Sequence, residues 1–213
     1  MTHLPDQERY VWDLSDEIKE SIITYTTRHY ARINDYLRHH TKGDSLTKRN
    51  VADLDSAFSN VPPLTSSIIV YRGIKPNLTG EEYFSDTAFI STTKVKRLAL
   101  EFSDRECCIL QITVSAGSRV LPIERLSYAS NEQEILFDRN GELIMTGSSI
   151  DNHNMKILYV TYLPKNSLDE KSLDVSSIHG SDVRPVENDW NDTAEKSRDE
   201  NISPSEIEKS LDF

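Results

Sequence analysis

The sequence predicts an α+β domain in which N-terminal helices precede a mostly antiparallel β body. Two observations support this fold class. Residues 15–40 repeat apolar side chains at helical spacing, whereas the chain after Pro62 and Pro63 consists of short β-branched and aromatic segments separated by turn residues. A length of 213 residues suits one hydrophobic core with an appendage.

The first helical region is expected from Ser15 to about His40, as one or two amphipathic helices with Ser15 as N-cap. Its apolar residues are spaced by three, four, seven or eight positions, as on one helical face: Ile18, Ile22, Tyr25, Ile33, Tyr36 and Leu37. A second helix is expected over 46–58. It must end before the two prolines, because proline cannot continue a helix.

The β body is expected to contain seven short strands, at 68–71, 88–91, 107–114, 119–121, 134–137, 142–147 and 155–163. One helix is expected among them, over 94–102. The pair Asn140-Gly141 predicts a hairpin turn after the strand at 134–137, because these residues tolerate positive φ at both central positions of the turn.

The acidity of the chain lies mostly in its C-terminal part. Residues 165–213 hold six Lys or Arg and thirteen Asp or Glu, a net charge of −7, whereas the preceding 164 residues have 18 and 22, a net charge of −4. The segment also lacks sustained apolar periodicity, so it cannot bury enough surface to offset its ordering entropy. We expect a disordered or loosely attached tail.

Composition also argues against several classes of protein. A net charge of −11 without a basic stripe does not suit a nucleic-acid binder. There is no apolar run of the roughly 20 residues that a membrane helix requires, and the start lacks a signal-peptide pattern. Neighbouring Cys107 and Cys108 cannot easily bridge each other. GxGxxG, P-loop, paired-Cys and HExxH motifs are absent, so we expect no metal. A cytoplasmic, soluble monomer is expected.

Three segments carry distinctive polar residues: VYRGI at 70–74, FISTT at 89–93 and NEQEILF at 131–137. In this order and spacing they resemble the Arg, Ser-Thr-Ser and Glu-x-Glu motifs of bacterial-toxin-like and phage-type mono-ADP-ribosyltransferases. The resemblance covers about residues 18–163, including the YARINDYLR helix, and leaves the tail unexplained. It implies a two-sheet β core and a catalytic domain over 1–164, with NAD as a substrate.

The first motif is implied to bind NAD. Arg72 would supply a rigid five-donor fork for the diphosphate. Gly73 would let the backbone approach the nicotinamide carboxamide. Without the other motifs, a strand-end ion pair for Arg72 and a turn for Gly73 would be the preferred interpretation.

The second motif is implied to hold the catalytic glutamate through the Ser91 hydroxyl and to line the NAD site with Thr92. Thr93 stands where serine is usual, and both residues carry a hydroxyl. The alternative is plain β-propensity, with Thr93 as N-cap of the next helix. Phe102 corresponds to an aromatic residue near the nicotinamide, although a ring on a helix face is as often plain core.

The third motif provides the catalytic carboxylates. Residues i and i+2 of an extended segment face the same way, so Glu132 and Glu134 are expected to enter one cleft. By resemblance, Glu134 stabilises the charged ribosyl centre and Glu132 engages the acceptor guanidinium. A Gln in place of Glu132 would indicate Asn or other acceptors. The alternative is a solvated strand edge. Tyr128, in the preceding loop, is implied to contact the target protein, or else it anchors the loop.

The sequence therefore predicts transfer of ADP-ribose from NAD to arginine side chains of a target protein, in the cytoplasm or after delivery into a host cell. Three alternatives remain: an NAD glycohydrolase on the same fold, a non-catalytic NAD- or protein-binding module, and a structural β-domain. A His-Tyr-Glu type transferase would need histidine where Arg72 stands.

Overall fold

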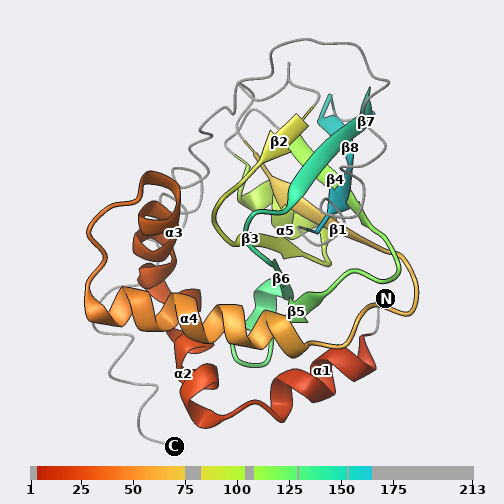
Figure 1. Cartoon of the computed structure of the whole chain (residues 1–213). Coiled ribbons are helices and arrows are strands. Elements are labelled where there is room, and N and C mark those ends of the chain that lie inside the picture. The colour runs from red at the N-terminus through yellow and green to blue at the C-terminus, as the bar shows by residue number, and fades with distance from the viewer. Residues whose placement is uncertain (1–3, 75–82, 104–107, 129, 153, 165–213) are drawn as a thin grey trace, which may run out of the picture.

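The computed structural model describes residues 4–74, 83–103, 108–128, 130–152 and 154–164 (Figure 1). Helices come first and strands follow, so the predicted α+β class is confirmed. The predicted acidic tail lies outside the described residues. None of the helices in the described ranges is long and apolar enough to cross a membrane.

Four helices form the N-terminal part: α1 (Pro5–Trp12), α2 (Asp16–Thr24), α3 (Tyr30–His39) and α4 (Ser45–Asn60). Ser15 caps α2 as predicted, since its side chain accepts a hydrogen bond from the Ile18 N–H at 3.4 Å. Helix α1 was not predicted, although Pro5 at its first turn and the acidic residues that follow are typical of a helix start.

The helical region predicted from Ser15 to His40 is broken near its middle. A π-helical turn, Tyr25–His29, separates α2 from α3, and Thr27 has a non-helical ψ of −162°. Two threonine hydroxyls donate to carbonyls one turn back, Thr26 to Ile23 and Thr27 to Thr24. These local bonds compete with the helical backbone bonds and explain the break.

The strands form one mixed sheet in the order β2-β7-β8-β4-β1-β3-β6-β5. Each predicted strand is present within a few residues, and β2 was not predicted. The strands are β1 (Ile68–Gly73), β2 (Tyr83–Ser85), β3 (Ile90–Thr93), β4 (Cys108–Val114), β5 (Val120–Pro122), β6 (Glu134–Phe137), β7 (Glu142–Ile150) and β8 (Lys156–Leu163), with helix α5 (Lys96–Glu101) after β3. Within the described part of the chain only β4 and β8 pair in parallel, so the sheet is mostly antiparallel as expected.

The expected division into two separate sheets is wrong, because hydrogen bonding runs through all eight strands. The continuity is nevertheless narrow at one place. Strand β1 pairs with β4 at six positions but with β3 at only one, Tyr71 opposite Thr93. The sheet therefore consists of two halves that meet at a single residue pair, which we call the sheet junction.

The predicted hairpin at Asn140-Gly141 is also wrong. Strand β6 pairs with β3 and β5, whereas β7 pairs with β2 and β8, so the turn carries the chain from one half of the sheet to the other. Asn140 has φ of +61°, but Gly141 does not have positive φ. Gly141 is required by packing, since an added Cβ would lie 2.3 Å from Cε2 of Tyr162.

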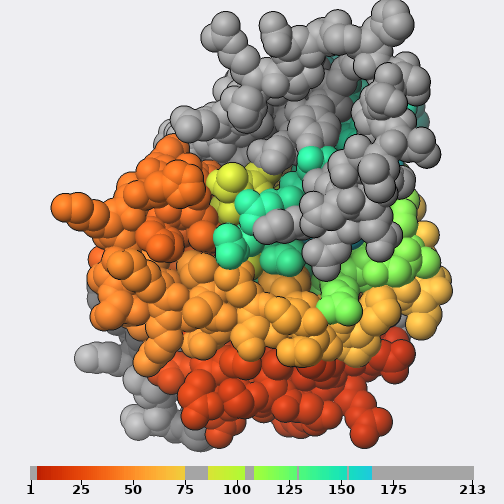
Figure 2. All heavy atoms as spheres, in the orientation of Figure 1, coloured from red at the N-terminus to blue at the C-terminus, as the bar shows by residue number. Residues whose placement is uncertain are grey.

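The N-terminal helices α1 to α4 pack on the β3-β6-β5 half of the sheet and cover one end of the molecule (Figure 2). Phe89, just before β3, stacks on Phe58 of α4 at 5.8 Å between ring centroids and meets the edge of Tyr25 at 5.9 Å. All three rings are buried. This contact fixes the start of β3, which bears the second motif, against the helices.

The other half of the sheet has its own apolar cluster, in which α5 covers residues of β4 and β8. Cys108 lies in the sheet core; it is buried and free, and burial raises the pKa of its thiol. Cys107 lies outside the described residues.

Candidate active site

The three predicted motifs meet at the sheet junction. Arg72 is on β1, Ser91 is on the neighbouring β3, and Glu134 is the first residue of β6, on the far side of β3. The Arg72 side chain donates through Nη1 to the main-chain oxygen of Ser91 at 2.6 Å. The sheet order therefore brings together residues that are up to 62 positions apart in the sequence.

Arg72 and Glu134 are close enough to influence each other electrostatically. Burial lowers the pKa of the Arg72 guanidinium, and the positive charge of Arg38 lowers it further. The negative groups nearby, Asp86, Tyr25 and Glu134, act in the opposite direction and raise this pKa. Glu134 is 6% exposed. A buried guanidinium among carboxylates forms a polar centre with little contact to water, in which charges interact more strongly than at a surface.

Tyr25, which was predicted only as part of an apolar helix face, also belongs to this centre. Its hydroxyl accepts a hydrogen bond from Nδ2 of Asn34 at 3.2 Å. Burial and the charge of Glu134 raise the pKa of Tyr25 to about 12, against the effect of hydrogen bonds from Ser91 and Asn34. Ser91 thus lies close to Tyr25 and Glu134, in the neighbourhood expected for a residue that holds the catalytic glutamate.

The two threonines of the second motif tie β3 to the third motif. The Thr92 hydroxyl is buried and donates to the Ile135 carbonyl at 2.7 Å. The Thr93 hydroxyl donates to the Glu132 carbonyl at 2.7 Å and accepts from the Val95 N–H at 3.1 Å. Thr93 is not the N-cap of α5, because that helix begins two residues later than expected and has Val95 in the cap position.

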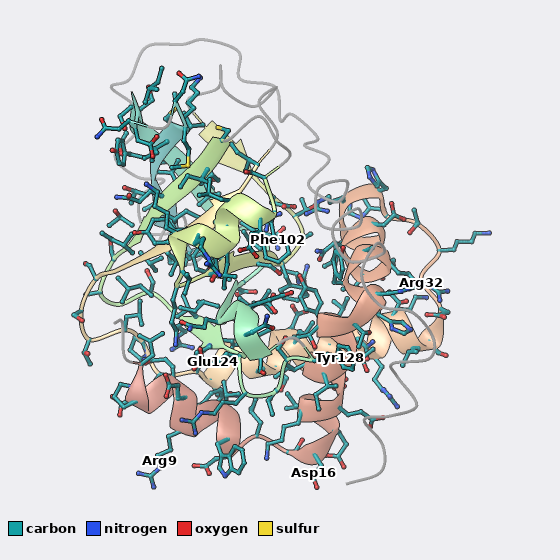
Figure 3. The ribbon with its side chains drawn as sticks, turned by 180° about the vertical axis from the view of Figure 1, so that it is seen from behind. Arg9, Asp16, Arg32, Phe102, Glu124 and Tyr128 are labelled. Atoms are coloured by element: carbon teal, nitrogen blue, oxygen red, sulfur yellow. The ribbon has the colours of Figure 1, made fainter. Side chains whose placement is uncertain are left out.

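Gly73 has a structural requirement of its own. An added Cβ would lie 2.3 Å from the Ala99 oxygen and 2.5 Å from the Ser103 nitrogen, both backbone atoms of α5 and the residues after it. Glycine therefore lets α5 pack directly on the end of β1. Phe102, which follows α5 and is half-buried, is held near the junction by the same contact (Figure 3).

The Glu-x-Glu segment does not have the extended conformation that we predicted. Glu132 ends a 3-10 turn, Ser130–Glu132, and Gln133 has φ of +48° before β6 begins at Glu134. The same-face argument from strand periodicity is therefore wrong here. Glu134 is buried and Glu132 is partly exposed, so the two carboxylates have different environments.

Comparisons with known proteins identify the family of the chain. A family model described as ADP-ribosyltransferase exoenzyme matches residues 6–83 and 77–165. The chain belongs to this family. It is an NAD-using, toxin-like ADP-ribosyltransferase. No curated protein sequence matches the chain significantly.

Solved structures support the fold of this transferase. Plx2a, an ADP-ribosyltransferase toxin from Paenibacillus larvae, is 20% identical with a TM-score of 0.62, over 74% of this chain and 90% of its own. The C3 exoenzyme of Clostridium limosum is 22% identical with a TM-score of 0.63, over 74% and 89%. Exoenzyme S of Pseudomonas aeruginosa, in complex with human 14-3-3 protein beta and carba-NAD, is 20% identical with a TM-score of 0.60, over 81% and 92%.

Tyr128 is the most exposed of the predicted site residues of the transferase. Tyr128 lies on the loop before β6 and is 67% exposed to solvent (Figure 3). Its main-chain N–H donates a hydrogen bond to the Thr26 hydroxyl at 3.1 Å. The loop backbone is thus fixed to the π-helical turn, while the phenol ring faces solvent.

Sequence reasoning also missed a buried ion pair beside Arg72. Arg38 of α3 donates through Nε and Nη2 to the two carboxylate oxygens of Asp86, at 3.0 and 2.7 Å. Both side chains are nearly buried, 7% and 3% exposed. Two features of the sequence could have indicated this pair. Arg38 stands four residues after Asn34, on the same face of a helix, and Asp86 stands shortly before FISTT. No group of three or more potential metal ligands occurs within the described ranges.

Proposed function

We propose that the transferase modifies arginine side chains of a target protein, with Glu134 acting on NAD and Glu132 acting on the acceptor. The observation that carries this proposal is the contrast between the two carboxylates. Glu134 is buried beside Arg72 and Tyr25, whereas Glu132 is partly exposed, two residues away across a left-handed turn.

In the proposed NAD site, Arg72 binds the diphosphate, because a guanidinium presents several N–H donors in a fixed plane. The buried Arg38–Asp86 pair supplies a second guanidinium in the same region, oriented by two hydrogen bonds. Gly73 and Phe102 would lie beside the nicotinamide. This assignment is supported by the guanidinium N–H donors, which suit the phosphate oxygens of an anionic dinucleotide.

The proposed reaction breaks the bond between the ribose C1 and the nicotinamide nitrogen, and the bonding electrons leave with nicotinamide. The positive charge that develops on the ribose is stabilised by the Glu134 carboxylate, a preorganised electrostatic contribution. A guanidinium nitrogen of the target then attacks C1, and Glu132 takes the proton that this nitrogen loses. Tyr128 contacts the target protein.

We further propose that residues 1–164 form the catalytic domain and that residues 165–213 are an appendage. The family match, which ends at residue 165, supports this division. The transferase is proposed to act as a monomer on a protein inside a cell, either its own or one into which it is delivered.

Incubation with labelled NAD and a cell lysate, followed by mass-spectrometric mapping, tests the proposal. We expect label on arginine side chains, and no label with the Glu134→Gln variant. Label on asparagine or another residue would refute the arginine assignment. Nicotinamide release without any labelled protein would instead identify an NAD glycohydrolase.

A further inference from the structure

The loop between β5 and β6 carries both residues that we assign to the acceptor, Tyr128 and Glu132. It leaves the sheet after Ile123 and returns at Glu134, where the Ile123 N–H donates to the Glu134 carbonyl at 3.1 Å. The residues just inside this closure are Glu124 and Gln133. How these two ends are held determines where the loop presents its side chains.

Lys94, the residue directly after β3, contacts both ends of the loop. Its Nζ lies 3.2 Å from Oε2 of Glu124, and its main-chain N–H donates to the Gln133 carbonyl at 3.3 Å. A third contact links Nζ to Oε1 of Glu8, on α1, at 3.6 Å. One residue thus joins the start of the loop, its end and the N-terminal helix.

This is not an ordinary surface ion pair. The side chains of Lys94, Glu8 and Glu124 are only 7%, 16% and 22% exposed. Removing such charges from water costs much of the Coulombic gain, so the arrangement contributes little net stability. What it does provide is a fixed geometry, because the ammonium must stay between its two carboxylates.

The conformation of Gln133 indicates why that geometry matters. A non-glycine residue with φ of +48° is strained and persists only where its surroundings hold it. The Gln133 carbonyl is held by the Lys94 N–H, and the preceding Glu132 carbonyl is held by the Thr93 hydroxyl. The left-handed turn separates partly exposed Glu132 from buried Glu134.

We propose that Lys94 is a positioning residue for the acceptor step, which acts through Glu124 to hold the loop that bears Tyr128 and Glu132. The inference rests on the proposed function, since it concerns the transfer of ADP-ribose to protein and not the cleavage of NAD. Glu134 itself is held by its pairing with Thr93 in the sheet.

The test compares Glu124→Gln with the matched control Glu8→Gln, since each removes one carboxylate from the same ammonium but only Glu124 belongs to the loop. Two activities are measured with labelled NAD: labelling of lysate proteins over a range of lysate concentrations, and nicotinamide release without lysate. For Glu124→Gln we expect the lysate concentration at half-maximal labelling to rise by about tenfold, as when substrate binding is weakened. Nicotinamide release should change by no more than about twofold. Glu8→Gln should change both by less than about threefold.

A purely structural role would lower both activities together with the melting temperature, and that result would overturn the inference. Unchanged half-maximal labelling in a folded Glu124→Gln protein would also overturn it. If Glu124→Gln does not fold, the charge-conserving Glu124→Asp serves in its place, with a smaller shift in the same direction expected. Absence of labelling by the wild-type protein would refute the proposed function itself, so the two failures are distinguishable.

Discussion

Arg72 on β1 donates to the Ser91 carbonyl on β3 at 2.6 Å, across the junction where these strands share only the pair Tyr71 and Thr93. The side chain proposed to bind the NAD diphosphate therefore also helps to hold the two halves of the sheet together. A guanidinium has five N–H donors, so the bond to Ser91 is compatible with phosphate contacts from the same group. NAD binding and the geometry of the junction are consequently linked.

Substitution of Arg72 by Ala should weaken NAD binding by about 2 kcal/mol or more, roughly thirtyfold in dissociation constant, because a charge-assisted contact is lost. Calorimetric titration with NAD measures this. The matched control is Arg119→Ala, since Arg119 also donates through Nη1 to a main-chain carbonyl, that of Ser59, but lies outside the proposed site. Unchanged affinity in Arg72→Ala would remove Arg72 from the NAD site.

Substitution of Gly73 by Ala should destabilise the fold by about 2–3 kcal/mol, because the new Cβ overlaps rigid backbone of α5. Gly147→Ala is the control, since its nearest neighbour would be a Tyr159 ring atom at 3.8 Å. Urea unfolding of both variants measures the difference. Equal stability of the two would show that α5 can move away from β1 at little cost.

Tyr25 should contribute a pH-dependent stability that is specific to alkaline solution. Its folded-state pKa is raised to about 12 from an ordinary value of 10.0, so the folded protein holds the phenol proton more tightly than the unfolded chain does. The contribution is fully present below pH 10 and is lost as the pH rises toward 12. Over this range it amounts to about 3 kcal/mol. Unfolding of Tyr25→Phe between pH 9 and 12 should show a shallower loss of stability than the wild type; parallel curves would contradict this.

The strands and the motif residues could be predicted from the sequence because they depend on local signals. The short apolar run at 135–137 located β6 to the residue, and the order of the three motifs located Arg72, Ser91 and Glu134. Strand pairing is different, because it depends on contacts distant in the chain. The sequence Asn140-Gly141 favours a hairpin locally, but Gly141 is needed for packing on Tyr162 and the flanking strands pair elsewhere.

The polar surroundings of the site were not predictable in the same way. Tyr25 looked like a core residue because its position fits the apolar face of the helical region predicted from Ser15 to about His40, and only the fold brings it beside Glu134. The prediction that Glu132 and Glu134 lie on one extended segment was wrong because the residue between them has left-handed backbone geometry. That residue is Gln133, and a glutamine does not signal such a conformation as glycine or asparagine would. That turn is held by bonds from β3 and from Lys94, which sequence periodicity does not reveal.

Truncation after Pro164 should leave the fold and the release of nicotinamide nearly intact, because a polar and acidic segment contributes little buried area. The melting temperature should change by no more than about 2 °C, which corresponds to roughly 0.5 kcal/mol in a domain of this size. Differential scanning calorimetry of the full chain and of residues 1–164 measures it. A large drop would mean that the tail packs on the domain and that the proposed division of the chain is wrong.

The last prediction separates the two glutamates and, with them, transfer from hydrolysis. Glu134 is proposed to act on NAD itself, so Glu134→Gln should reduce both protein modification and nicotinamide release by about a hundredfold or more. Glu132 is proposed to act on the acceptor guanidinium, so Glu132→Gln should abolish arginine modification but keep a good part of the slow hydrolysis of NAD by water. The different burial of the two carboxylates supports this division, since only Glu134 belongs to the buried centre with Arg72 and Tyr25. Nicotinamide release with and without protein acceptor, together with melting curves, measures both effects. Full arginine transfer by Glu132→Gln, or full turnover by Glu134→Gln, would show that the carboxylates do not divide the reaction in this way.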